Sequence, residues 1–103
     1  MKHKILIFCG ESILDTSISW RILKFLKKKR YLEYSKICLL TKDEKIIKFL
    51  KDNKISYTNS FKKVILNTKK NEFNFLLNLW GNYIFKKDFL KKFKNSMNIH
   101  PSY

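Results

Sequence analysis

The apolar run KILIFC at residues 4–9, followed directly by the turn sequence GES at residues 10–12, decides the fold of this 103-residue chain. Side chains of a β-strand alternate between its two faces, so a strand that is apolar at nearly every position is buried on both faces. Such strands lie in the middle of parallel sheets that helices cover on both sides. We therefore expect residues 4–9 to form a central strand that ends at Gly10.

Apolar runs alternate with amphipathic segments along the rest of the chain. Further strands are predicted at residues 36–40, 55–57, 73–79 and 96–100, and helices at about 17–28, 43–52, just after 60, and 85–93. Ser17, Thr41 and Ser60 are the candidate helix caps. Strands that alternate with helices form βαβ units with right-handed crossovers. The sequence thus predicts an α/β fold for residues 1–103, a single Rossmann-like three-layer domain with a mainly parallel sheet of about five strands.

The net charge of +15 raises the question of a nucleic-acid partner. Only Arg21 and Arg30 among the 23 basic residues are arginines, the residue type that binds phosphate and guanine in a bidentate manner. The lysines are spread over every predicted helix and form no single stripe. We expect no specific binding of nucleic acid. The alternative is a non-catalytic basic module that binds RNA or acidic surfaces through its lysines.

Targeting signals, membrane spans and metal motifs are not found in the sequence. Residues 5–9 are too few for the core of a signal peptide, and no stretch approaches the ~20 apolar residues of a membrane span. Cys9 and Cys38 fall in two predicted strands without the spacing of a metal site. We expect a cytoplasmic protein, without a membrane partner or a metal, whose two thiols are buried and reduced; a disulfide is the alternative. The oligomeric state is not indicated.

The turn GESILDTS at residues 10–17 lies where many α/β proteins hold a phosphate. It contains one glycine and two acidic residues, which differs from the dinucleotide fingerprint and disfavours an anion. Ser12 and Asp15 are candidates to bind an amine or a hydroxyl group of a substrate. The alternative is an ordinary capped turn.

The sequence Asn98-Ile99-His100-Pro101-Ser102 ends the last predicted strand. Alternation gives Asn98 and His100 the same face and directs Ile99 into the opposite layer. Pro101 has no N–H for a sheet ladder and therefore stops the strand. An amide and an imidazole are thus predicted at the carboxyl end of a strand, where open α/β sheets bind their ligands.

Residues 75–103 resemble the formyltransferase family, whose members use 10-formyltetrahydrofolate. In that family an apolar strand leads through a glycine-containing turn and a helix to a strand that ends in Asn-x-His-Pro-Ser. Here these parts correspond to residues 75–79, Gly81, residues 85–93 and residues 98–102. The first strand ending in glycine and the passage IIKFLKDNKISY at residues 46–57 agree more loosely with the family.

The resemblance implies a mechanism in which a substrate amine attacks the formyl carbon. Asn98 would donate a hydrogen bond to the formyl oxygen, and His100 in its protonated form would stabilise that oxygen and help to move protons. The segment after the fourth predicted strand would line a groove for the pterin ring of the formyl donor, and it consists of Trp80, Gly81, Asn82, Tyr83 and Ile84.

The family also has a downstream aspartate that orients the histidine, a loop that completes the folate pocket, and a C-terminal substrate domain, all of which lie beyond Ser102 in its members. The resemblance therefore implies the N-terminal part of a catalytic domain, which is inactive alone. An inactive truncated remnant is the alternative. The chain lacks the phosphate loop of the purine-pathway enzyme and the Arg/Gly-rich insertion of the methionyl-tRNA enzyme. By elimination the small-molecule amine substrate is expected to be a nucleotide-linked amino sugar.

Overall fold

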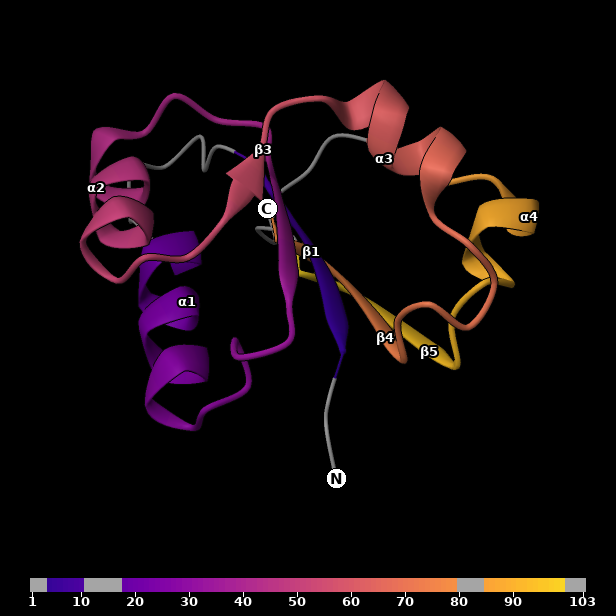
Figure 1. Ribbon diagram of the computed structural model, residues 1–103, viewed down its shortest axis with the longest axis horizontal. Helices are drawn as coiled ribbons and strands as arrows, with labels where there is room; N and C mark the ends of the chain where they lie inside the picture. Colours follow the sequence, from indigo (N-terminus) through magenta and orange to yellow (C-terminus); the bar gives the residue numbers. More distant parts are fainter. Residues whose placement is uncertain (1–3, 11–17, 80–84, 100–103) are drawn as a thin grey trace.

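The computed structural model describes residues 4–10, 18–79 and 85–99 of the chain (Figure 1). Within these residues strands and helices alternate regularly. Their order is β1 (Ile5–Cys9), α1 (Ile18–Lys28), β2 (Lys36–Leu39), α2 (Glu44–Asp52), β3 (Tyr57–Thr58), α3 (Phe61–Asn67), β4 (Phe75–Leu79), α4 (Lys87–Leu90) and β5 (Asn95–Ile99). None of these helices is both long and apolar enough to cross a membrane.

The strands form one parallel sheet in the order β3-β2-β1-β4-β5. β1 lies in the middle, as the apolar run at residues 4–9 predicted, and all five of its residues are buried. The predicted α/β class, the Rossmann-like arrangement and the parallel sheet are therefore confirmed.

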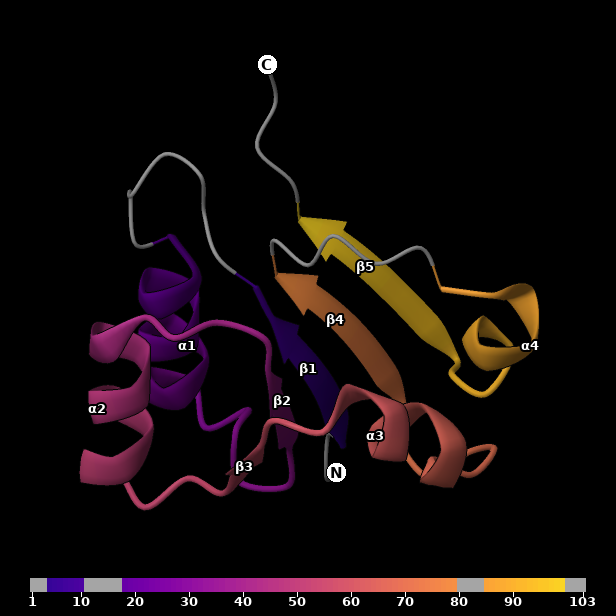
Figure 2. The same cartoon turned by 90° about the horizontal axis from the view of Figure 1, so that it is seen from above.

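The handedness of the crossovers explains which helix covers which face. The chain moves along the sheet in one direction from β1 to β3, and in the opposite direction from β3 to β5. Right-handed crossovers therefore place α1 and α2 on one face and α3 and α4 on the other, as Figures 1 and 2 show. In both views α1 and α2 lie beside β1, β2 and β3. At the carboxyl ends Leu79 of β4 is buried and Ile99 of β5 is half-buried on that side, but no described helix covers the amino-terminal parts of β4 and β5 there. The expectation that both faces are fully covered is thus wrong for this half of the sheet.

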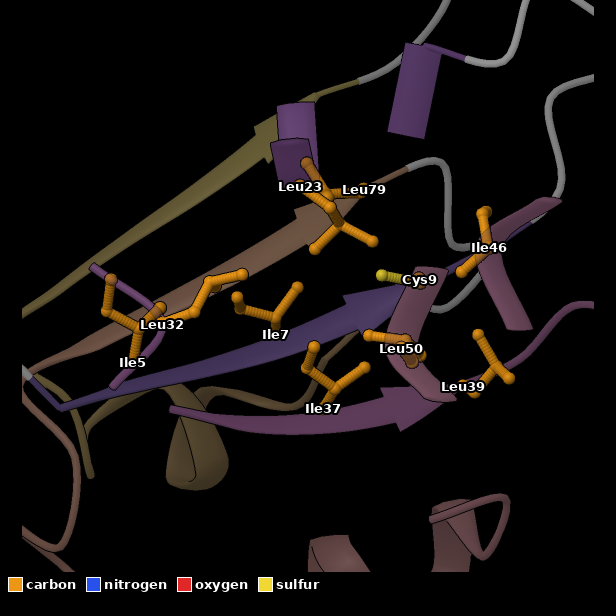
Figure 3. Packing of buried hydrophobic residues seen from close by; sticks show 10 residues of the cluster. All are labelled: Ile5, Ile7, Cys9, Leu23, Leu32, Ile37, Leu39, Ile46, Leu50 and Leu79. Carbon is orange, nitrogen blue, oxygen red and sulfur yellow. The ribbon is translucent and has the colours of Figure 1, made fainter. Parts of the chain in front are cut away.

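Two apolar clusters hold the layers together. In the first, side chains of α1 and α2 such as Leu23 and Leu50 are directed toward β1 and β2 (Figure 3). In the second, Phe8 is the central ring on the α3 and α4 face, in contact with Phe61 and Phe89. Each fully buried Leu or Phe contributes about 1.5–3 kcal/mol relative to an exposed one, and β1 supplies residues to both clusters.

Several element boundaries differ from the sequence prediction. Asp43, rather than Thr41, is the N-cap of α2, and its carboxylate accepts a hydrogen bond from the Lys45 N–H at 2.9 Å. The Thr41 hydroxyl instead accepts from the Asp43 N–H at 3.0 Å. Ser60 is the N-cap of α3 but makes no side-chain cap bond. Ser17 lies outside the described residues.

The two longest helices, α1 and α2, end with the same hydrogen-bond motif. At the end of α2 this motif shifts the start of β3 toward the C-terminus. The Ile55 N–H donates to the Leu50 carbonyl at 2.8 Å, and the Lys54 N–H donates to the Lys51 carbonyl at 3.1 Å. This 6→1 and 5→2 pattern requires a left-handed residue, here Lys54 with φ 55°. Ile55 is used to end α2, so the strand predicted at residues 55–57 starts at Tyr57.

Substitution of Lys54 tests the strain at this helix end. The left-handed region costs a non-glycine residue about 1 kcal/mol, so Lys54→Gly is expected to raise the free energy of unfolding by about 1 kcal/mol. Lys51→Gly, within α2, is the matched control and is expected to lower it by about the same amount. Urea denaturation measures both. A Lys54→Gly variant as destabilised as Lys51→Gly would contradict the left-handed assignment.

Candidate functional site

The carboxyl edge of β1, β4 and β5 brings two asparagines together. Asn98 of β5 is paired with Asn78 of β4, which in turn is paired with Phe8 of β1. Paired residues of a parallel ladder point to the same face, and adjacent strands lie about 4.8 Å apart. The two amides are therefore neighbours on the face that carries α3 and α4.

The two asparagines differ in exposure. Asn98 is exposed on an edge strand, so a ligand can reach its amide, and Ile99 packs into the first core on the opposite face, as alternation predicted. Asn78 is fully buried. Asn78 was not among the predicted site residues, although one polar residue within the apolar run FLLNLW was a usable signal, because an amide is seldom buried without a structural or functional reason.

Aromatic rings form a hollow on the same face. The Phe8 ring centroid lies 5.0 Å from that of Phe85 and 5.6 Å from that of Phe61. Beside these rings a mainly apolar hollow of about 320 Å³ is lined in part by Phe61, Ile65, Phe85 and Phe89. Phe85 is the first described residue after the segment 80–84, which was predicted to line a pterin groove.

The other predicted site residues lie outside the described residues: Ser12, Asp15, Trp80, Gly81, Asn82, Tyr83, Ile84 and His100. The strand ends from which their segments continue are described. The Gly10 N–H donates to the Leu79 carbonyl at 2.7 Å, which fastens the end of β1 to the end of β4. β5 pairs with β4 up to Ile99. The three segments with predicted site residues therefore leave the sheet from adjacent positions at one edge.

Ser19 in the first turn of α1 is a further buried polar residue and was not among the predicted site residues. Only 3% of this residue is exposed, and its hydroxyl makes no hydrogen bond within the described part of the chain. α1 follows β1 directly, so its first turn lies near the carboxyl edge. A serine within the apolar stripe of a helix was the signal for this position.

The two thiols are buried and free, as predicted, and the disulfide alternative is wrong. Burial, together with the neighbouring Cys38, raises the pKa of Cys9 to about 12. Burial also raises the pKa of Cys38 to about 11, although nearby Lys36 opposes the shift. Both thiols stay protonated at neutral pH, so neither acts as a nucleophile. Across residues 4–10, 18–79 and 85–99, no cluster of three His, Cys, Asp or Glu side chains is suited to hold a metal ion.

Comparisons of this chain with protein-family models, with curated proteins and with solved structures find no match. The resemblance to formyltransferases consequently rests on the residues of the sequence itself.

The state of the thiols gives a direct test of this packing. At about pH 8 a buried, protonated thiol is expected to react with a disulfide reagent at least ~100-fold more slowly than an unfolded one. We expect neither Cys9 nor Cys38 to be modified on the time scale on which both react in concentrated urea. Rapid modification of either thiol in the native protein would contradict the packing around β1 and β2.

Proposed function

We propose that this chain takes part in the transfer of a formyl group from 10-formyltetrahydrofolate to a substrate amine. The observation that carries the proposal is the position of Asn98, exposed at the carboxyl end of β5 in a parallel sheet. His100, Pro101 and Ser102 follow it closely in the sequence and complete the motif that resembles the family.

In the proposed reaction the amine nitrogen attacks the formyl carbon, and negative charge develops on the formyl oxygen. The Asn98 amide donates a hydrogen bond to this oxygen, and the protonated imidazole of His100 stabilises the same charge. The bond from the formyl carbon to the folate nitrogen then breaks, and the proton lost by the amine replaces the formyl group on that nitrogen. A preorganised donor of this kind is worth about 10²–10³ in rate.

Binding of the formyl donor is assigned to the segment from Trp80 to Ile84. The apolar hollow beside Phe85 supports this assignment, because its aromatic walls suit one side of a flat ring. The hydrogen bond between the ends of β1 and β4 supports it as well, because residues 80–84 and the turn with Ser12 and Asp15 continue the chain from those two ends.

Ser12 and Asp15 are proposed to bind the substrate amine, which we infer to belong to a nucleotide-linked amino sugar. A carboxylate can accept a hydrogen bond from the neutral amine, whose lone pair stays free to attack the formyl carbon, and a hydroxyl group can bind a sugar hydroxyl. The buried hydroxyl of Ser19, which has no hydrogen-bond partner among the described residues, adds a polar group in the first turn of α1.

A second candidate function is favoured by the opposite edge of the sheet. There a hollow of about 500 Å³ is lined by Lys27, Arg30 and Lys54, which suits a polyanion such as RNA. Two features weaken the electrostatic attraction between this hollow and a polyanion. Glu33 pairs with the Arg30 guanidinium at 2.8 Å, and the carbonyl ends of α1 and α2 border the hollow. Formyl transfer therefore remains the primary proposal.

Substitution on β5 tests the proposal. Formyl transfer is assayed with a panel of amines in the longest natural chain that contains this sequence. Asn98→Ala and His100→Ala are each expected to lower kcat by about 10²–10³ and to change the KM for the formyl donor little. Asn95→Ala, an exposed asparagine at the other end of β5, is the matched control and keeps the rate. An Asn98→Ala enzyme with most of its activity would overturn the assignment.

Donor binding is measured separately, by tryptophan fluorescence of the 103-residue chain during titration with 5-formyltetrahydrofolate. Gly81→Val is expected to weaken binding by about tenfold or more, because a branched side chain fills space next to the ring. If the unchanged chain neither binds the folate nor transfers formyl groups to any amine, and binds RNA instead, the second candidate function replaces the first.

A further inference from the structure

On the face beside α1, the amino-terminal parts of β4 and β5 are uncovered, whereas Leu79 and Ile99 at the carboxyl ends pack into the first core. The crossover geometry leaves the amino-terminal parts open, because the connections from β3 to β5 pass over the other face. Two parallel strands with one uncovered face are unusual, since parallel sheets are normally buried on both sides. The open area around Phe75, Leu77 and Met97 is the β4–β5 face.

The β4–β5 face is apolar and hollowed. A depression of about 450 Å³ is lined by Ile5, Phe75, Leu77 and Met97 among other residues. Met97, in the middle of β5, is 61% exposed, although it is paired with the half-buried Leu77 of the neighbouring strand. A methionine at the centre of an exposed strand face is a soft contact that adapts to many apolar partners.

The adjacent flank of α1 continues this surface. Trp20 lies on the flank toward α2, because the ammonium groups of Lys24 and Lys45 lie 3.6 and 5.9 Å from its ring. Helical spacing puts Phe25 about 140° around the axis from Trp20, on the other flank. Phe25 is 56% exposed. Phe25 therefore adds an exposed aromatic side chain on the flank of α1 that is turned away from α2, on the side of β4 and β5.

The charges around the β4–β5 face are positive. Lys4 and Lys94 stand directly before β1 and β5, and both are exposed. On α1, Arg21 and Lys28 lie one turn to either side of Phe25, and the Lys29 ammonium lies 5.8 Å from the Phe25 ring. The residues that line the depression include no acidic side chain.

We propose that the β4–β5 face binds an amphipathic helix of a partner protein, apolar on one side and rich in Asp and Glu on its flanks. A helix with its side chains is about 10–12 Å wide, which matches the width of two strands about 4.8 Å apart. Its apolar stripe covers Leu77 and Met97, and its carboxylates meet the surrounding lysines.

The positive charge of the protein favours an acidic partner helix over a second copy of the chain on the β4–β5 face. With a net charge of +15, two copies repel each other, and apposed β4–β5 faces bring the same lysines together. The apolar floor also distinguishes this face from the polar hollow at the opposite edge, which suits a polyanion without an apolar stripe.

The test uses a designed peptide as the probe. The peptide has about 16 residues, with leucines at helical spacing on one side and glutamates elsewhere. Fluorescence anisotropy measures its binding to the 103-residue chain. Met97→Glu is expected to weaken binding by about tenfold or more, because it introduces a like charge at the apolar centre. Met97→Leu retains binding. Leu66→Glu, at a 79% exposed apolar residue on α3 across the sheet, is the matched control and changes affinity by less than about twofold.

Two further probes make the result decisive. A peptide of the same composition, in which the leucines no longer share a side, is expected to bind at least about tenfold more weakly. Equal binding of the two peptides would show that the protein responds only to the negative charge of the peptide, and this would overturn the proposal. Sedimentation equilibrium of the protein alone is expected to show a monomer. A dimer that Met97→Glu abolishes would identify a second copy as the occupant, which likewise overturns it.

Discussion

Burial of β1 on both faces is the constraint on which the rest of the structure depends. Its odd-numbered residues pack under α1 and α2, and its even-numbered residues, Leu6 and Phe8, pack under α3 and α4. Two layers of helices are needed to cover such a strand, and right-handed crossovers allow only one arrangement of those layers around it. The position of every other strand end, including the end of β5 with Asn98, follows from that arrangement.

The same constraint determines what the sheet edges contain. The carboxyl edge carries the neighbouring asparagines and lies close to the rings around Phe8, so polar donors and apolar walls lie near each other. The opposite edge receives the ends of α1 and α2, where Lys27 and Lys54 complement the helix carbonyls. Much of the high positive charge at that edge thus has a structural explanation. The thiols of Cys9 and Cys38, held protonated between the layers, contribute packing rather than chemistry.

The alternation of apolar runs with amphipathic segments was sufficient to predict the α/β class, the parallel sheet and the central place of residues 4–9, since these depend on periodicity and burial alone. The boundaries depended on local hydrogen bonds that periodicity does not reveal. Ile55 has a strand-like side chain but ends α2. Phe85 and Phe93 continue a helical spacing although α4 spans only Lys87–Leu90, because both rings are held by contacts with other rings rather than by helix.

At the site, position and motif predicted Asn98 at the carboxyl edge, but tertiary pairing was needed to find its buried neighbour Asn78. The open β4–β5 face likewise could not be predicted from the sequence, because Phe75, Leu77 and Met97 show the same apolar pattern whether or not a helix covers them.

The central claim is that the carboxyl edge of β1, β4 and β5 is the functional surface of this protein. Amide chemical-shift mapping with 5-formyltetrahydrofolate on the isotope-labelled chain tests it most directly. The account predicts that the shifted amides cluster at Gly10, Leu79 and Asn98, whose strand ends lie together. Shifts confined to Lys27 and Lys54 at the opposite edge, or no shifts at saturating ligand, would contradict it.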